Sequence, residues 1–321
     1  MKNHQFVCAL LCGAVALASC NKNLSKDEYP LPEEGEKCVL NVNAFSSLQV
    51  KSTGEAGAVA ENEKIIGTLQ VFVFRDDMLD AYGTGKGPSM SLTCTAGDRE
   101  VYALVNAPDM SSISSKTKLL SHLIDLNANA TKALVMFGSS TAKLPTTSAV
   151  NISVTRMVSR IVVHKITRNF ESASLNSLTF KINSIYVRNA AGNGSISGKV
   201  AVSKWYNGSS AETDLPTLLY DRVSATVAKD ASYTTPHYFY TMPNDNSENT
   251  TRVVIDATLG TKTYYYPVDL PALERNKSYE FTEIKIKRPG SDDADTPVTT
   301  SDISFNVNVV DWTLVSVTEE I

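Results

Sequence analysis

Residues 251–270 read TRVVIDATLGTKTYYYPVDL, two short runs rich in valine, threonine and tyrosine with turn residues between them. β-Branched and aromatic runs bounded in this way are typical of β-strands. The pattern recurs between residues 150 and 290, in VNISVTRMVSRIVVHKITRNF, SLTFKINSIYVRNAAGNG, PHYFYTMPND and KSYEFTEIKIKRPG. Many short strands at this spacing, with almost no helix, predict a mostly β protein built as an antiparallel sandwich.

The composition is that of an ordinary globular chain. The 321 residues are 42% hydrophobic and 20% charged, with a formal net charge of -4. This length accommodates two domains of typical size. We place the boundary near residue 155, where the second series of strands begins. The weakly acidic balance gives no basic surface, so we expect no nucleic-acid partner.

The first twenty residues, MKNHQFVCALLCGAVALASC, have the features of an export signal. A charged start at Lys2 precedes an apolar run over residues 6–18, which is short for a transmembrane helix. The run ends in LASC, which resembles the bacterial lipobox. We therefore expect residues 1–19 to be a lipoprotein signal peptide and Cys20 to carry diacylglycerol and palmitate, a firm membrane anchor. The alternative is an ordinary secretory signal in which Cys20 is incidental.

The first strand of the folded part is expected at residues 38–45, CVLNVNAF. Its alternation places four side chains on one face, those of Cys38, Leu40, Val42 and Ala44. A polar tether containing two prolines precedes it. The residues that follow, 46–64, are small and polar, and they predict an exposed loop.

The rest of the first half contains a predicted hairpin and one predicted helix. Residues 89–108, SMSLTCTAGDREVYALVNAP, give two strands around Gly97 and Asp98, either of which can supply the positive backbone dihedral of a hairpin turn. Residues 114–129, SSKTKLLSHLIDLNAN, repeat leucine at helical spacing after serines that can cap a helix. His122 within this helix is interpreted as a surface or packing residue.

No catalytic or metal-binding pattern is found. No serine lies in a nucleophile elbow, and no histidine pair has zinc spacing. The acidic stretches 243–251 and 290–297 lack the spaced carboxylates and central glycine of a calcium loop. Cys94, within a predicted strand, is interpreted as a buried structural thiol. We therefore predict a protein that is not an enzyme and has no metal or cofactor.

The last twenty residues, DISFNVNVVDWTLVSVTEEI, have the pattern of a strand. Apolar residues alternate as far as Val309, and the phase slips by one residue at Val310, which predicts a bulge-like break. A chain end with this many apolar residues either lies inside a sheet or pairs with a neighbouring molecule. We expect both: the part before the slip completes the chain's own sheet, and the part from Trp312 onward pairs with another subunit.

Several of these segments, in this order, resemble the FimA-type fimbrillins, the major stalk subunits of the type V pili of Bacteroidales. They are LASCNKN, LQVFVF, CTAGDREVYALVNAP, the predicted helix, TRMVSRIVVHKI and TKTYYYPVDL. The most specific part is the final block, which contains Glu274-Arg275-Asn276, Tyr279, Gly290 and Val310-Asp311-Trp312-Thr313.

The resemblance implies two transthyretin-like β-sandwich domains, residues 52–155 with one short helix and residues 156–321, in a protein that polymerises. In that family the precursor reaches the outer membrane as a lipoprotein, and a protease cuts after the first strand. The carboxy-terminal strand of another subunit then fills the groove left behind. Residues 20–51 correspond to the propeptide. The donor strand would use Trp312, Leu314, Val315 and Val317.

The partners implied by this mechanism are identical subunits in a homopolymer, anchor and tip subunits, a processing protease, and host or bacterial surface ligands. The expected location is a cell-surface fimbria that supports adhesion. A donor strand that buries four or five apolar side chains, at ~1.5–3 kcal/mol each, gains roughly 6–15 kcal/mol before costs.

One departure from the family concerns the cleavage site. The stalk subunits are cut after an arginine, whereas the first arginine here is Arg75, at the end of the second predicted strand. We place the cut after Lys51 and the mature amino terminus near Ser52, although another protease or no cut at all stays open. A Cys38–Cys94 bridge, which an oxidising compartment permits, would tether the departing strand, so we predict free thiols.

Two alternative functions remain. An accessory pilus subunit, either a basal anchor or a tip adhesin, has no need to donate a strand, so the long tail favours a stalk subunit. A surface lipoprotein that binds glycans would stack sugars on Trp205 or on Tyr264, Tyr265 and Tyr266, although alternation within a strand places half of these rings in the core.

Overall fold

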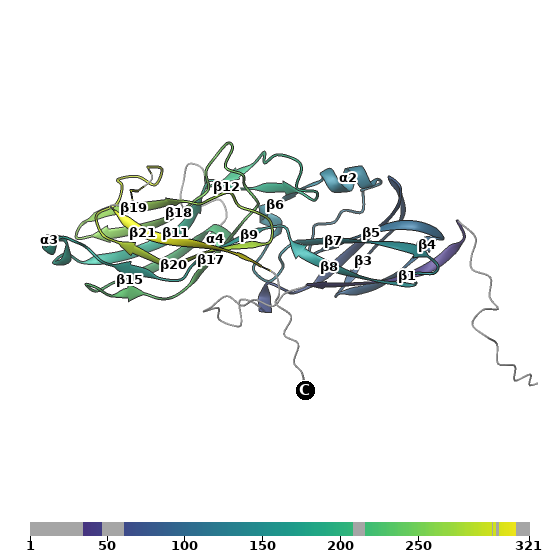
Figure 1. The fold of residues 1–321 in the computed structure, drawn as a ribbon, viewed down its shortest axis with the longest axis horizontal. Helices are drawn as coiled ribbons and strands as arrows, with labels where there is room; N and C mark the ends of the chain where they lie inside the picture. The colour runs from purple at the N-terminus through teal and green to yellow at the C-terminus, as the bar shows by residue number, and fades with distance from the viewer. Residues whose placement is uncertain (1–34, 47–60, 208–215, 297, 300–301, 313–321) are drawn as a thin grey trace, which may run out of the picture. The chain divides into compact units, whose positions relative to one another are not determined.

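The computed structural model of the chain describes residues 35–46, 61–207, 216–296, 298–299 and 302–312, all within one compact unit, Pro32–Ile321. The described residues are mostly in β-strands (Figure 1). The helical segments are short: α2 Lys116–Ser121, η1 Leu126–Ala128 (a 3₁₀ turn), α3 Ala173–Asn176 and α4 Pro216–Leu219. The prediction of a mostly β protein is confirmed.

The first sheet has seven strands in the spatial order β3-β2-β5-β7-β8-β1-β4. Their bounds are β1 Lys37–Ser46, β2 Thr68–Arg75, β3 Met78–Lys86, β4 Ser89–Thr95, β5 Gly97–Val105, β7 Met136–Leu144 and β8 Ala149–Arg156. The two ends of this sheet meet, because a β-carbon on Gly83 in β3 would lie only 2.5 Å from Leu92 in β4. The sheet therefore curls around its own apolar cluster, as in a sandwich.

The second sheet follows the path β16-β10-β20-β9-β17, and β21 pairs with β20 alone. Its strands are β9 Ser159–Val163, β10 Ile166–Arg168, β16 Ser232–Tyr233, β17 His237–Thr241, β20 Lys277–Ile286 and β21 Ile303–Asp311. The third sheet, in the order β15-β11-β18-β19, contains β11 Phe180–Arg188, β15 Tyr220–Thr226, β18 Arg252–Leu259 and β19 Lys262–Asp269. Apolar side chains of both sheets share one cluster, as sandwich packing requires.

Two small pairs complete the described strands. β12 Ala190–Ala191 pairs with β14 Trp205–Tyr206, and β6 Leu123–Asp125 pairs with β13 Asn193–Ser195. The strands of the first sheet end at Arg156 and those of the second begin at Ser159. The β6–β13 pair connects the two halves of the chain, so the division into two domains near residue 155 stays a prediction.

The strand pairing differs from the antiparallel sandwich that the sequence predicted. β1 is parallel to β8, and β20 is parallel to both β9 and β10. Both larger sheets are therefore mixed. Short strands between turn residues do not reveal which distant strand each one joins, so the pattern carried no information on these pairings.

The predicted helix over residues 114–129 is wrong beyond its first turns. Ser115 caps α2 as expected, but the backbone becomes extended at His122, and the chain continues as β6. The ladder with β13 and the bonds that Asp125 accepts from Lys204 Nζ (2.6 Å) and Tyr206 Oη (2.8 Å) favour the strand. Tertiary pairing thus overrides the leucine spacing. His122 is exposed, as predicted.

The predicted hairpin around Gly97 and Asp98 is also wrong. Gly97 does adopt a positive φ, +118°, but the strands on either side of it do not pair with each other. β4 pairs with β1, whereas β5 pairs with β2 and β7. The glycine therefore lets the chain cross from one end of the curled sheet to its middle, which brings β4 beside the first strand.

Candidate functional site

The predicted first strand is present as β1, inside the first sheet (Figure 1). Its first residues pair antiparallel with β4, from Lys37 opposite Thr95 to Asn43 opposite Ser89. Its last residues pair parallel with β8, from Asn41 beside Ala149 to Ser46 beside Val154. β1 is thus the one link between β4 and the rest of the sheet in the described ladder.

The inward face of β1 contributes to the core. Leu40, Val42 and Ala44 are at most 1% exposed and belong to the cluster enclosed by the first sheet. Cys38 is half-buried at the start of the same face. Removing β1 would leave an apolar slot between β8 and β4 and would leave β4 without a ladder partner.

The outward face of β1 is polar and is tied to both neighbouring strands. Asn41 Oδ1 accepts a hydrogen bond from Ser91 Oγ (2.6 Å), and Asn43 Oδ1 accepts one from Ser89 Oγ (2.8 Å). Asn43 Nδ2 also donates to Asn151 Oδ1 of β8 (3.3 Å). These bonds face solvent, so each contributes little net free energy. They fix the register of the strand rather than its stability.

The two cysteines of the folded part lie directly opposite each other in the β1–β4 ladder. Opposed residues of antiparallel strands have α-carbons about 4.5–5.5 Å apart, which is within disulfide range. Both thiols are nevertheless free, as predicted. Burial is the main cause that raises the pKa of the Cys94 thiol to about 12, so this thiol is protonated and unreactive at neutral pH.

The carboxy-terminal strand β21 lies at the edge of the second sheet and pairs only with β20. Most of its side chains are exposed, including Phe305, Val309 and Val310 at 37%, 51% and 39%. The predicted break at Val309-Val310 is wrong, because these residues pair in register with Tyr279 and Ser278. The irregularity lies on β20, between Phe281 and Ile284.

Trp312, predicted as the start of the donor strand, is only 2% exposed within its own chain. Its ring stacks on Tyr240 with centroids 5.9 Å apart, and its backbone N–H donates to Asn276 O (3.1 Å). A side chain held in this way is not available to a neighbouring subunit. The structure therefore moves the start of any donor segment to residue 313. The one sequence signal for this burial was the large aromatic ring just before the end of the chain's apolar pattern.

Five other predicted site residues lie outside the described residues. They are the lipidation site Cys20, the cleavage site Lys51, and the donor residues Leu314, Val315 and Val317. The signal peptide 1–19 and most of the propeptide 20–51 also lie there, apart from residues 35–46. These assignments stay predictions.

The aromatic residues proposed for glycan stacking are found in two different settings. Tyr266 is fully buried, while Tyr264 and Tyr265 are half-buried along β19. Trp205 is half-buried and lines a cavity of about 660 Å³ together with Asn244, Arg275 and other residues. Only Trp205 therefore presents a ring to a cavity of the size that small ligands occupy.

The described residues contain no group of three or more side chains able to hold a metal ion. In the same residues, no helix is long and apolar enough to cross a membrane.

Comparison with known proteins identifies the class to which these features belong. Residues 40–183 match the family described as major fimbrial subunit protein (FimA). The match covers 144 of the 321 residues and confirms the resemblance inferred from the sequence. This similarity indicates a structural, fimbrial kind of protein rather than an enzyme. No match was found among curated protein sequences.

Solved structures share the fold at low sequence identity. A candidate cell adhesion protein of Bacteroides eggerthii has a TM-score of 0.71 and 21% identity, covering 87% of this chain and 97% of its own. A fimbrilin of Porphyromonas gingivalis has a TM-score of 0.60 and 16% identity, covering 88% and 99%. A tip fimbrial protein of the same species has a TM-score of 0.53 and 14% identity, covering 86% and 100%. The fold is therefore shared by different kinds of fimbrial protein.

Proposed function

We propose that this protein is a stalk subunit of a cell-surface pilus that polymerises by strand exchange. A cut within residues 47–60, which contain Lys51, frees β1, and residues 313–321 of a neighbouring subunit take its place. The observation that carries the proposal is the position of β1, which alone joins β4 to the sheet and fills the core with Leu40 and Val42. A sheet that loses this strand needs a replacement.

The sequence of the tail suits the vacated slot. In an extended conformation, residues 313–321, TLVSVTEEI, would place Val315 and Val317 on one face, and Leu314 with Ser316 and Thr318 on the other. β1 presents the same arrangement, with Leu40 and Val42 inward and asparagines outward. An apolar face directed to the core and a polar face directed to Ser89, Ser91 and Asn151 would meet the needs of the slot.

The remaining parts of the proposal come from the sequence and the family. The precursor is an outer-membrane lipoprotein attached through Cys20. Processing leaves two sandwich domains, residues 52–155 and 156–321. The subunit joins copies of itself together with anchor and tip subunits, and the fibre adheres to host or bacterial surfaces. Labelling with a palmitate analogue, lost on Cys20→Ser, would support the anchor; equal labelling of both forms would oppose it.

Limited proteolysis tests the mechanism. Purified protein is treated with a lysine-specific protease, and ladders are sought on unheated gels and fibres by electron microscopy. The full chain should give ladders after cleavage. A Lys51→Gln variant should give none, and a chain ending at Trp312 should be cut and stay folded without forming them. Ladders from the chain ending at Trp312 would exclude residues 313–321 as the donor.

A second candidate function is glycan binding in the cavity beside Trp205. The cavity is lined by two cationic side chains, Lys199 and Arg275, and three carboxylates, Asp245, Glu248 and Glu274. The Arg275 guanidinium also donates to the backbone carbonyls of Ser195 (2.7 Å) and Ile196 (2.8 Å). A neutral sugar can bind to cationic and anionic side chains alike, because its hydroxyl groups both donate and accept hydrogen bonds. Its C–H face can stack on an indole ring.

Neutral mono- and oligosaccharides can be screened through the fluorescence of Trp205. A bound sugar should protect this ring from acrylamide quenching, and Trp205→Ala should abolish binding measured by calorimetry. Tyr264→Ala, which changes an aromatic residue outside the cavity, is the control. Absence of binding by any sugar on the panel, or equal binding by both variants, would count against this function.

A further inference from the structure

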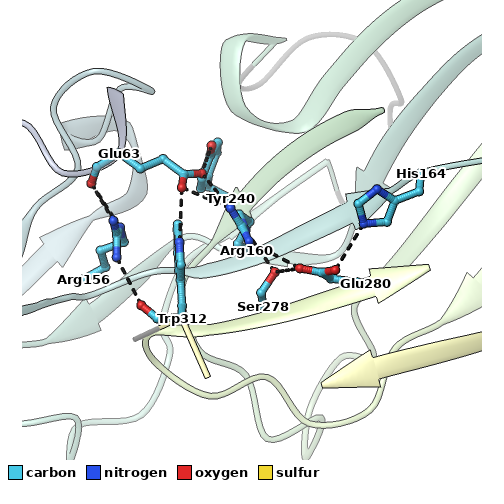
Figure 2. A network of polar contacts seen from close by, with 8 residues as sticks. All are labelled: Glu63, Arg156, Arg160, His164, Tyr240, Ser278, Glu280 and Trp312. Atoms are coloured by element: carbon cyan, nitrogen blue, oxygen red, sulfur yellow. Dashed lines mark hydrogen bonds and ion pairs between the residues drawn. The ribbon is translucent and has the colours of Figure 1, made fainter. Parts of the chain in front are cut away.

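A cluster of fully buried polar side chains surrounds Glu63 (Figure 2). The Glu63 carboxylate accepts hydrogen bonds from Tyr240 Oη (2.6 Å), Arg160 Nη1 (3.1 Å) and Trp312 Nε1 (3.2 Å). The Glu63 backbone carbonyl accepts two more from Arg156, at Nε (3.1 Å) and Nη2 (2.8 Å). All of Glu63 is thus held by side chains from β8, β9, β17 and the residue after β21.

Trp312 is the second centre of this cluster. The Arg156 guanidinium lies 4.1 Å and that of Arg160 4.9 Å from the centroids of the Trp312 indole rings, in cation–π contact. Arg156 Nη1 also donates to the Trp312 carbonyl at 3.5 Å. The indole is therefore held by two cations, by Tyr240 and by the Glu63 carboxylate.

The charges of the cluster balance inside the protein. Arg160 also contacts Glu280 (3.4 Å), which lies 3.2 Å from His164, so two arginines face two carboxylates. Glu63, Arg156 and Arg160 are at most 1% exposed. Removing one partner from such a buried set leaves a charge unpaired and is strongly destabilising, whereas loss of a surface pair changes stability little.

The positions of these residues along the chain connect the cluster with the two segments that the proposed assembly uses. Glu63 lies twelve residues after Lys51, the predicted cleavage site, and Trp312 immediately precedes residues 313–321. The contact between them spans 249 residues. One cluster therefore holds both the segment that would become the new amino terminus and the point where the proposed donor segment begins.

We infer that Glu63, Arg156 and Trp312 form a latch that fixes the root of the donor segment; this inference rests on the proposed function. Within a fibre, tension on residues 313–321 enters the subunit at Trp312. Without the latch it would act on the end of β21, an edge strand that pairs only with β20. An edge strand under tension can separate from its neighbour by losing hydrogen-bonded residue pairs one at a time, starting at its free end. A buried anchor at that end is required to prevent this.

Amide hydrogen exchange of the uncut monomer tests the latch without requiring polymerisation. Glu63→Gln keeps the shape and removes the charge, and Trp312→Phe keeps an aromatic ring and removes the N–H donor. Both should speed exchange across β21 by at least about tenfold, since they break buried charged contacts. Exchange in β11 and β18 should stay at the wild-type rate, which separates a local latch from a general loss of stability.

Asp311→Asn is the matched control, because Asp311 pairs with Lys277 beside Trp312 but is exposed. It should change β21 exchange by less than about twofold. The latch would be overturned if amide exchange in β21 kept its wild-type rate in both test variants. It would also be overturned if exchange in β11 and β18 accelerated as much as exchange in β21. Ladder assays on the same variants distinguish the latch from the proposed strand exchange. Failure of the wild-type protein to form ladders contradicts strand exchange between subunits. The amide hydrogen exchange rates of β21 still decide whether the latch exists.

Discussion

β1 and β21 are the two strands nearest the ends of the described chain, and their environments are opposite. β1 lies between two strands, with Leu40, Val42 and Ala44 at most 1% exposed. β21 lies at an edge, with Val309 51% exposed. Under the proposal the more deeply buried strand is the one that leaves, and the exposed strand is the one that stays.

This difference shows why assembly would need a covalent trigger. A central strand with a buried face does not leave spontaneously, because core contacts and two ladders hold it. A cut after β1 turns its departure into loss of a separate peptide, which a donor strand can then replace. β21 needs no such protection, since the cluster around Trp312 holds its end. Four changes can break or sharpen this contrast.

Deleting β1 should have the largest effect. A chain that lacks residues 35–46 loses the one strand that pairs with β4 in the described part of the chain, so amide exchange in β4 should accelerate by at least about a hundredfold, approaching that of an unprotected strand. Deleting residues 21–34 instead, which keeps β1, is the control. Protection of β4 that survives loss of β1 in a monomer would contradict the assigned role of this strand.

Shortening a single side chain to alanine should lower stability much more in β1 than in β21. Leu40→Ala in the core should lower the free energy of unfolding by about 2–5 kcal/mol. Val309→Ala on the exposed edge should lower it by about 0.5 kcal/mol or less. Urea denaturation measures both values. Val39→Ala, on the outward face of β1, gives a control within the same strand, because Val39 is 56% exposed.

Thiol reactivity should report departure of β1. In the uncut chain the pKa of Cys94 is raised to about 12, mainly by burial, so alkylation at pH 8 should be slow and should quicken only as the pH rises toward that value. Cleavage followed by loss of β1 exposes Cys94 and should speed its alkylation at pH 8. Mass spectrometry of a Cys38→Ser chain isolates this signal. The comparison uses a chain that ends at Trp312, in which no donor segment can cover Cys94 again; equal rates before and after its cleavage would show that β1 had not left.

The smallest effect is expected for the polar face of β1. Asn41→Ala removes the bonds that this side chain makes with Ser91 Oγ and Ser148 O at an exposed site, and it should lower the unfolding free energy by about 0.5 kcal/mol. The corresponding change on β21, Asn308→Ala, removes no side-chain bond seen in the described residues and serves as the comparison. A loss as large as that of Leu40→Ala would mean that the outward face, rather than the core, holds β1.

The sequence predicted what depends on local pattern and missed what depends on distant pairing. Alternation located β1 and its inward residues correctly, because period two is a property of the strand itself. The leucines of residues 114–129 predicted a helix, and the partner strand β13, seventy residues away, converted part of it to β6. Residues such as Glu63 and Arg156 carried no signal, since a polar residue in a loop or strand end shows its burial only when its partners are placed. Trp312 was assigned to a role outside the chain for the same reason.

Disulfide trapping within fibres tests strand exchange most directly. Of the five cysteines only Cys94 follows residue 51, and in the uncut chain it lies opposite Cys38 of β1. A donor strand in the place of β1 must set one of its own residues opposite Cys94. Single cysteines introduced along residues 313–321, among them Val315→Cys and Val317→Cys, should therefore form intermolecular disulfides with Cys94 after cleavage, at alternate positions and not in the uncut protein. Absence of a cross-link to Cys94 at every tail position in assembled fibres would contradict the account.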